Sequence, residues 1–501
     1  MTAAGLAAVT ALNQAAARDP RNADNWLKLG AALQAQRNLD AALASFRNAA
    51  AVQPSNASAH AAIGALLLRT GKFAEAADSL TTALAHDARS PGVAFNRALA
   101  FGALGKLDLA TADYERAFAI DPSDRRLLAS FVGHLHRRHD DAAAEAVIER
   151  ARPITAIGAQ VALANLRADQ MRNDEALTAF QAALDLDPTD PSAHWSRSLV
   201  LLRMGNLRDG FREFEHRLDG FVETAGRVLP GPEWNPASAQ SAQKILLYAE
   251  QGLGDTIQFI RLAKLVQSRG RNVALLPPRA LARLCRTLDP NIAVLSADQP
   301  LPRYDAHCSL MSLPAKLGTE LATIPSKTPY LHVDEASAAH WRARIAHLSG
   351  TRIGLCWSGS ATHAGDALRS VALNQMRTLT DVPGVSFVSL QKDVRPSDRE
   401  ALLSNEHLLD VMSEISDLHD TAALITALDL VITVDTSIAH LVGALGKPVW
   451  ILLPFAPDWR WLTAREDSPW YPTARLFRQD ESRTWEPVLA RVAARVASGA
   501  R

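Results

Sequence analysis

An acidic residue at a turn between a strand-like run and a helical run is the first place where this chain could do chemistry. The stretch from Glu250 to Thr256 reads EQGLGDT and follows the apolar run KILLYA. Glycines allow a tight turn with close backbone approach, and Asp255 then falls where the strand's carboxyl end opens. A carboxylate there can accept a proton from a substrate hydroxyl within hydrogen-bond reach. Aspartate at a helix start is also a frequent N-cap, so spacing alone leaves both roles open. The turn residues that would line a cleft beside Asp255 are Gln251, Gly252 and Gly254.

A second candidate site lies in the segment VDTSIAH, between the apolar run LVITV and a helical run. Backbone N–H groups at a helix start, the helix dipole and the hydroxyls of Thr436 and Ser437 together favour a bound diphosphate. His440 lies one helical turn further on. The alternative is that Asp435 or Thr436 only caps the helix and His440 packs against its neighbours.

Basic and polar residues follow two further strand-like runs. Trp357, Ser358 and Gly359 follow RIGLC, and a polar loop then leads to Arg369. Arg369 can offer planar donors to a diphosphate. Gln391 and Lys392 end the run VSFVSLQK, which would bring them to the same rim. A surface salt bridge is the commoner fate of a lone arginine or lysine, and that alternative stays open.

Several common catalytic patterns are missing from the sequence. There is no GxSxG, no HExxH and no paired CxxC, and the one Asp-x-Asp, Asp185 to Asp187, ends a repeat helix. We therefore expect neither a serine hydrolase nor a zinc enzyme, and no metal held by an aspartate pair. Three tryptophans and Tyr471 fall within residues 457–472; they could stack on a sugar or base, but we favour packing at the domain edge.

Short apolar runs alternate with helical stretches from Lys244 onward. Runs that are apolar on both faces predict parallel strands covered by helices. The alternation pauses over residues 325–348 and then restarts with RIGLCWSG. We therefore predict two Rossmann-like lobes, 244–335 and 336–501, with a ligand cleft between the carboxyl ends of their strands.

The N-terminal part carries an internal repeat with the 34-residue tetratricopeptide spacing. The first copy is formed by Trp26, Leu29, Gly30, Leu33, Ala42, Phe46, Ala49 and Pro54. Two more copies follow in register, the pattern blurs over 125–154, and it then resumes. Small residues at fixed positions let paired helices approach, which predicts an α-helical solenoid over residues 1–220. Residues 221–243, rich in proline and serine, are predicted to be a linker.

Charge and cysteine usage limit the partners and the compartment. Fifty-three basic residues balance fifty-three acidic ones, so nothing predicts nucleic-acid binding. Three widely spaced cysteines fit neither a disulfide framework nor a metal site. We find no export signal and no membrane-spanning run, and we expect a cytoplasmic protein.

Together, YAEQGLGDTIQFIRLA, VDTSIAHLVGALGKPVWILLP and DWRWLTAREDSPWYPTARLFRQ resemble bacterial tetratricopeptide proteins whose C-terminal half is similar to the heptosyltransferase-type glycosyltransferase family nine. The resemblance implies a GT-B fold and a metal-independent, inverting sugar transfer from a nucleotide-diphosphate sugar, without a further cofactor. It also implies that the C-terminal lobe binds the donor. Asp255 falls where these enzymes place their general base, and Arg369 falls near a basic residue that contacts donor phosphate. Asp435, Thr436 and His440 match the family's Asp-Thr-Gly-x-x-His phosphate motif, whereas Ser437 replaces its glycine.

Three functions therefore stay open at the level of sequence. The first is an active glycosyltransferase whose acceptor could be a protein bound on the concave repeat surface. The alternative is an interaction scaffold whose GT-B half binds a nucleotide sugar or nothing. A sugar epimerase is a smaller third option.

Overall fold

The computed structural model of the chain describes residues 3–220, 229–236, 243–360 and 365–499. It divides into two compact units. The first comprises residues 1–167 and 178–188, and the second comprises residues 168–177 and 189–501. Of the predicted linker, residues 221–228 and 237–242 lie outside the described residues. Within the described residues, no helix is both long and apolar enough to cross a membrane.

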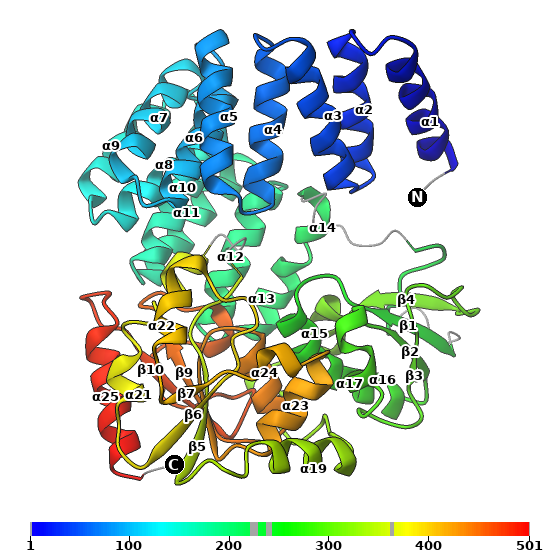
Figure 1. Cartoon of the computed structure of the whole chain (residues 1–501), viewed down its shortest axis with the longest axis vertical. Helices are drawn as coiled ribbons and strands as arrows, with labels where there is room; N and C mark the ends of the chain where they lie inside the picture. The colour runs from blue at the N-terminus through cyan, green and yellow to red at the C-terminus, as the bar shows by residue number, and fades with distance from the viewer. Residues whose placement is uncertain (1–2, 221–228, 237–242, 361–364, 500–501) are drawn as a thin grey trace. The chain divides into compact units, whose positions relative to one another are not determined.

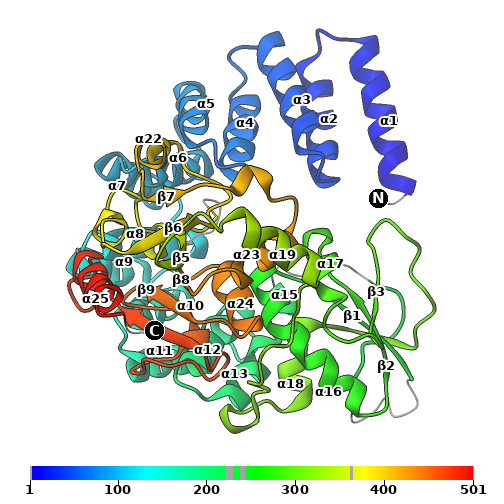
Figure 2. The ribbon, with the colours of Figure 1, turned by 60° about the horizontal axis from the view of Figure 1, so that its bottom comes forward.

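The first unit is built from antiparallel helix pairs, as Figures 1 and 2 show. Its helices, some of which also extend into the second unit, are α1 (Ala3–Arg18), α2 (Ala23–Ala35), α3 (Leu39–Val52), α4 (Ala57–Arg69), α5 (Phe73–His86), α6 (Pro91–Ala103), α7 (Leu107–Ile120), α8 (Arg125–Arg137), α9 (Asp141–Ala151), α10 (Ala156–Asp169) and α11 (Asn173–Leu186). The predicted solenoid is confirmed. The repeat pattern blurs where α9 has 11 residues, whereas α3, α5 and α7 each have 14.

Glycine at the eighth repeat position explains how the paired helices approach each other. A Cβ atom added to Gly30 would lie 2.5 Å from the Phe46 ring, and one added to Gly64 would lie 2.4 Å from Leu80 Cγ. Both distances are shorter than real side-chain contacts. The large residue of the second helix therefore occupies the space that a side chain on the first helix would need.

The second unit begins with three helices and continues into a four-stranded sheet. The helices are α12 (Pro191–Arg203), α13 (Leu207–Phe214) and α14 (Arg217–Gly220). The strands are β1 (Lys244–Tyr248), β2 (Asn272–Leu276), β3 (Ala293–Val294) and β4 (Ala306–Ser309). All pairs are parallel and the order is β3-β2-β1-β4. Its helices are α15 (Leu253–Phe259), α16 (Ala263–Ser268), α17 (Ala282–Cys285) and α18 (Leu313–Leu317). We call this the first sheet.

A six-stranded parallel sheet follows, which we call the second sheet. Its strands are β5 (Thr351–Cys356), β6 (Val385–Ser389), β7 (Leu408–Leu409), β8 (Leu430–Val434), β9 (Val449–Leu453) and β10 (Ala474–Arg478). Its helices are α19 (Glu335–Arg344), α20 (Asp366–Arg369), α21 (Arg377–Thr380), α22 (Arg399–Leu403), α23 (Leu418–Thr426), α24 (Ser437–Ala444) and α25 (Glu486–Ala497). The order β10-β9-β8-β5-β6-β7 means that the chain leaves β5 in both directions. The sequence prediction missed β10, because Arg475 and Arg478 break the apolar run of this short edge strand.

The strands of the second sheet are apolar on both faces, as predicted for a parallel sheet between helices. Val431 and Ile451 pack with residues of α23 and α24, whereas Ile432 and Leu452 pack with residues of α21 and α25. The first of these two clusters continues without interruption into the first sheet and into α13. The α/β arrangement of the C-terminal part is therefore one packed body. The exact domain boundaries stay predictions.

A buried ion pair fills the carboxyl end of the first sheet between β1 and β4. Arg217 on α14 donates two hydrogen bonds to Glu250, both at 2.8 Å, and one to Ser312 Oγ at 2.7 Å. Ser309 Oγ also donates to Glu250. The Arg217 and Glu250 side chains are 0% and 1% exposed. This crevice, where a doubly wound sheet commonly takes a ligand, is already occupied by the chain itself.

We predict that Arg217→Met destabilises the protein by about 3–5 kcal/mol, because it leaves the Glu250 carboxylate buried without its cation. Urea unfolding followed by tryptophan fluorescence measures the loss. The matched control is Arg475→Met, since Arg475 pairs with Glu466 at the surface. That control should lose about 1 kcal/mol or less. Equal losses in the two variants would contradict the role assigned to the buried pair.

Candidate functional site

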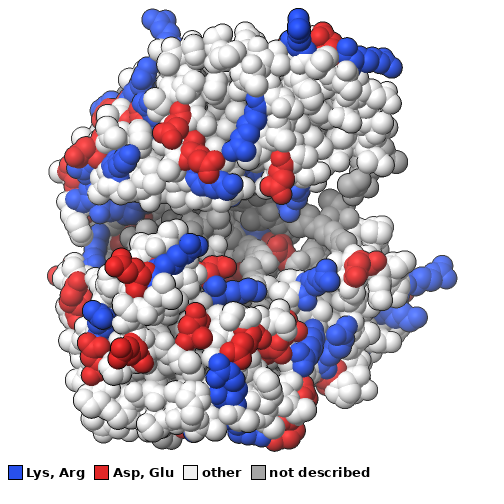
Figure 3. Space-filling model, viewed as in Figure 1, with Lys and Arg blue, Asp and Glu red and all other residues white. Residues whose placement is uncertain are grey.

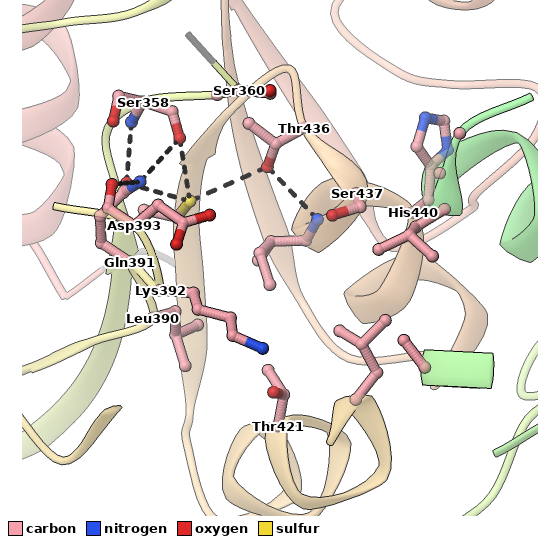
Figure 4. A pocket seen from close by; sticks show the side chains of 18 of the residues that line it. Ser358, Ser360, Leu390, Gln391, Lys392, Asp393, Thr421, Thr436, Ser437 and His440 are labelled. Atoms are coloured by element: carbon pink, nitrogen blue, oxygen red, sulfur yellow. Dashed lines mark hydrogen bonds between the residues drawn. The ribbon is translucent and has the colours of Figure 1, made fainter. Parts of the chain in front are cut away.

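A cavity of about 670 Å³ lies where the carboxyl ends of the two sheets meet. Figure 4 shows it from close by. The predicted site residues that line it are Gly252, Gly254, Asp255, Ser358, Gly359, Arg369, Gln391, Lys392, Asp435, Thr436, Ser437 and His440. They come from loops after β1, β5, β6 and β8. The opposed loops after β5 and β8 form the switch point of the second sheet.

Two of the predicted cleft residues, Gln251 and Trp357, do not line the cavity. The Trp357 side chain is fully buried in the core below the second sheet. Its indole N–H donates to Asp398 Oδ2 at 3.0 Å. Trp357, directly after β5, is therefore a packing residue, and only its backbone leads into the site.

Gln391 shapes the site by bonding to the loop that follows β5. Its Oε1 accepts from the backbone N–H groups of Trp357 and Ser358 at 3.1 and 2.9 Å. Its Nε2 donates to the carbonyls of Ser358 and Asp393 at 3.0 and 3.2 Å. These four bonds use both lone pairs of the amide oxygen and both N–H donors of the amide nitrogen, so Gln391 fixes backbone geometry. Direct contact between Gln391 and a nucleotide-sugar donor stays a prediction.

The Ser358 hydroxyl is a buried polar group with no protein partner among the described residues. Ser358 is 2% exposed and lines the cavity. A buried hydroxyl without a hydrogen bond is costly, and a ligand that accepts a hydrogen bond from it would relieve that cost. This orphaned hydroxyl points to a polar ligand at the end of β5.

Arg369 and Lys392 supply positive charge to the same wall. Arg369 Nη1 donates to the Asp435 carbonyl at 2.8 Å, and its side chain is 19% exposed. A Cβ on Gly359 would lie 2.6 Å from Arg369 Nη2, so glycine there makes room for the guanidinium. Figure 4 shows Lys392 pointing towards Thr421 across the cavity. Within the described part of the chain, Lys392 makes no hydrogen bond or ion pair. The Lys392 ammonium group therefore faces the cavity and does not form the surface salt bridge that the sequence analysis left open.

The start of α24 carries a side-chain cap at the edge of the cavity. Thr436 is the N-cap, and its hydroxyl accepts from Ile438 N at 3.3 Å. Ser437 begins the helix and lines the cavity. His440 is buried; its Nδ1 lies 2.9 Å from the Tyr471 hydroxyl, and its ring stacks on Trp461. Burial lowers the pKa of His440 well below its usual value, so the ring is neutral. His440 therefore packs against its neighbours, which was the alternative interpretation of this residue. The helix start remains open to an anion.

Asp435 is a buried carboxyl at the end of β8. It is 8% exposed, and burial, reinforced by the nearby Asp458 carboxylate, raises its pKa to about 7. Arg369 and Arg460 oppose that rise. The native protein thus holds a proton on Asp435 over a pH range in which the unfolded chain would release it.

Asp255 is neither a simple N-cap nor an isolated base. It is the third residue of α15, and its Oδ2 accepts from Gly252 N at 2.9 Å. Its Oδ1 accepts a short hydrogen bond from Arg460 Nη2. Sequence reasoning missed Arg460, although it lies within the tryptophan-rich segment. The only signal for it there is an arginine between two aromatic residues, DWRW.

The tryptophan-rich segment itself packs into the core. Trp459, Trp461, Trp470 and Tyr471 are all buried. The Trp459 ring contacts Phe211, Phe259 and Trp470. This arrangement agrees with the packing interpretation of the segment. None of the four aromatic side chains lines the cavity.

Close approach of two helix starts brings the opposite walls of the cavity together. A Cβ on Gly254 would lie 2.8 Å from His440 Cδ2 and 3.5 Å from the Ser437 Cα. Figures 1 and 2 both show α15 beside α24. The second glycine of QGLGD is therefore needed for packing between the sheets. This is a different reason from the backbone approach to a ligand that its spacing suggested.

One group of possible metal ligands lies at the cavity's edge. Side-chain atoms of Asp417, His419 and Asp420 lie within 4.8 Å of one another. Arg283 Nη1 already bonds Asp420 at 3.0 Å and lies 3.8 Å from Asp417. A guanidinium in that place competes with a cation, and the sequence prediction of a metal-free site stays a prediction.

We predict that Asp435→Asn changes the pH dependence of stability. The pKa of Asp435 is raised in the native state, so the native state binds this proton more tightly than the unfolded chain does. The resulting stabilisation of the native state is present at low pH and is lost as pH rises towards and through 7. Relative to the variant, the wild type should therefore lose about 2 kcal/mol between pH 5 and pH 8. Urea unfolding at both pH values measures this difference.

The control for that measurement is Asp393→Asn, which removes an exposed carboxylate from the same cavity. Its difference from the wild type should be the same at pH 5 and pH 8. If Asp435→Asn behaves in the same way, Asp435 is not protonated in the native protein near neutrality.

Models of tetratricopeptide repeats match this chain in its N-terminal part. One, described as TPR repeat, matches residues 164–205, and another, described as tetratricopeptide repeat, matches residues 27–94 and 62–125. Similar solved structures include TTC0263, a thermophilic TPR protein of Thermus thermophilus, with a TM-score of 0.31 and 25% identity, covering 36% of this chain and 100% of that one. A tetratricopeptide repeat protein from Parabacteroides merdae ATCC 43184 has a TM-score of 0.32 and 20% identity, covering 39% of this chain and 79% of that one.

A longer match is to Protein FlbA of Caulobacter vibrioides (strain ATCC 19089 / CIP 103742 / CB 15). It is 28% identical over 328 residues, which cover 60% of this chain and 54% of that protein. The chain therefore spans about half the length of this curated relative. The N-terminal part of the chain consists of tetratricopeptide repeats, and such arrays present an extended surface that binds other proteins.

Proposed function

We propose that the chain is a glycosyltransferase with a GT-B fold, which transfers a sugar from a nucleotide-diphosphate sugar to an acceptor hydroxyl. The observation that carries the proposal is the wall formed by the ends of β5, β6 and β8. It combines the orphaned Ser358 hydroxyl, the free Lys392 ammonium and the start of α24 in one cavity. Hydroxyl, ammonium and backbone N–H donors converging at a helix start suit a diphosphate.

The proposed reaction uses both walls of that cavity. Asp255 accepts the proton of the acceptor hydroxyl, whose oxygen forms a bond to the anomeric carbon from the face opposite the diphosphate. The bond from that carbon to the diphosphate oxygen breaks, and the diphosphate leaves with the electron pair. Arg369, Lys392 and the N–H groups of α24 then stabilise its developing charge. Attack from the opposite face inverts the configuration at the anomeric carbon.

Tetratricopeptide repeats support a protein acceptor. The repeats indicate a protein partner, and an acceptor segment bound by them would reach the cavity at a raised effective concentration. The alternative function is an interaction scaffold in which the GT-B half binds a nucleotide sugar without turnover. The pairing of Asp255 with Arg460 favours that alternative, because the charge-assisted bond occupies one of the two carboxylate oxygens that could accept the proton.

We predict that Lys392→Gln weakens binding of a nucleotide-diphosphate sugar about tenfold or more, because it removes a charged donor that has no other partner. Calorimetry against a panel of nucleotide sugars measures the change. Lys327→Gln is the matched control, since Lys327 is exposed and does not line the cavity. It should bind like the wild type. No binding of any panel member by the wild type would reject the proposed donor site.

We predict that Asp255→Asn lowers transfer at least a hundredfold and leaves affinity for the donor within about threefold. The amide keeps the size of the carboxyl group but cannot accept the proton. Sugar transfer is measured as the release of nucleoside diphosphate in the presence of candidate protein acceptors. Affinity for the donor is measured by calorimetry. Undiminished transfer in this variant would remove Asp255 from the role of base. Donor binding without any transfer by the wild type would favour the scaffold.

A further inference from the structure

Arg460 is a buried cation that connects the two sheets at the cavity. It lies in a short 3-10 turn, Trp459–Trp461, that follows β9, and it is 8% exposed. Its Nε donates to Gln258 Oε1 at 2.6 Å, and its Nη1 donates to Asp458 Oδ1 at 2.9 Å. Its Nη2 donates to Asp255 Oδ1, and its guanidinium lies 4.4 Å from the centre of the Trp459 ring. Asp255 and Gln258 belong to the first sheet's α15, so the guanidinium bonds both sides of the cavity.

The contacts of Asp255 leave its carboxylate little freedom to rotate. One oxygen accepts from the N-cap backbone N–H of its own helix, and the other accepts from Arg460. Its side chain remains 22% exposed and lines the cavity. Two charge-assisted bonds from different directions fix the plane of the carboxylate while its outer lone pairs stay accessible.

The charges around Arg460 keep it protonated. Burial opposes the charge, but the carboxylates of Asp458, Asp255 and Asp435 outweigh burial and raise the pKa of Arg460 above its usual value. A charged guanidinium therefore lies beside Asp255. Because it lies in a buried position, its field is weakly screened by solvent.

We propose that Arg460 is the positioning residue for Asp255: it holds the carboxylate in one orientation, so the base is assembled from both sheets. The link to catalysis rests on the proposed glycosyltransferase function. The pairing itself does not, and it can be tested without any substrate.

The test is a titration of the Asp255 carboxyl carbon by NMR in protein labelled with ¹³C in aspartate, with Asp255→Asn used to assign the signal. In Arg460→Met the midpoint should lie about one pH unit or more above that of the wild type, because the neighbouring positive charge is lost. Arg460→Lys should restore most of the difference. An unchanged midpoint in Arg460→Met would overturn the proposal.

Asp458→Asn provides a second test that keeps the arginine and covers the case in which Arg460→Met does not fold. It removes a carboxylate that competes for the guanidinium but keeps the Oδ1 that accepts from Arg460 N. The midpoint of Asp255 should then move to lower pH, because Arg460 is shared by fewer carboxylates. A shift to higher pH, or no shift, would count against the proposal.

Arg261→Met is the matched control for packing between the sheets. Arg261 is also buried and bonds the Trp470 carbonyl at 2.7 Å and the Tyr330 hydroxyl at 2.7 Å, without contacting Asp255. This variant should lose stability and leave the Asp255 midpoint in place. If it moves the midpoint as far as Arg460→Met does, loosened packing explains the effect and the proposal fails.

Kinetics separates this inference from the proposed function. Where the wild type shows transfer, Arg460→Met should lose at least tenfold in kcat, keep its donor affinity, and move the acidic limb of the rate profile to higher pH. A shifted NMR midpoint without any transfer by the wild type would reject the glycosyltransferase and retain the pairing. Normal transfer with an unshifted profile in Arg460→Met would reject the positioning role alone.

Discussion

The contact between the start of α15 and the start of α24 is the constraint on which the cavity depends. Gly254 permits it, because a side chain there would overlap His440. The contact brings the loop after β1 opposite the loop after β8, and it lets the core run continuously between the sheets. Without it, Asp255 and the polar ends of the second sheet would lie on separate surfaces.

Charge within the second unit is arranged around buried arginines. Arg217 fills the switch point of the first sheet, Arg261 bonds across the aromatic segment, and Arg460 bonds Asp255. Each guanidinium offers donors in several directions, so it can join segments that are distant in sequence. One consequence is that the open space lies at the switch point of the second sheet. The other is that the carboxylates of the cavity remain close to positive charge. On the surface, by contrast, Figure 3 shows basic and acidic side chains interspersed on the visible face.

Residues at the carboxyl ends of strands have different roles in this site, although their sequence positions are equivalent. Gln391 uses its amide on the backbone of the loop after β5, Trp357 packs in the core, and Ser358 is left with a free hydroxyl. The loop is held before any ligand arrives, which reduces the ordering cost of binding. Rigid support and an unsatisfied donor in adjacent positions distinguish the site from an ordinary strand end.

The sequence by itself determined the repeats, the α/β alternation and most of the residues around the cavity. These features depend on local periodicity and on the rule that parallel strands present their carboxyl ends at one edge. Tertiary structure alone decided the pairing of Asp255 with Arg460, which are 205 residues apart, the filling of the first switch point by Arg217, and the raised pKa of Asp435. Charge pairing and desolvation depend on which groups come close in space, and the spacing of residues along the chain carries no record of that distance.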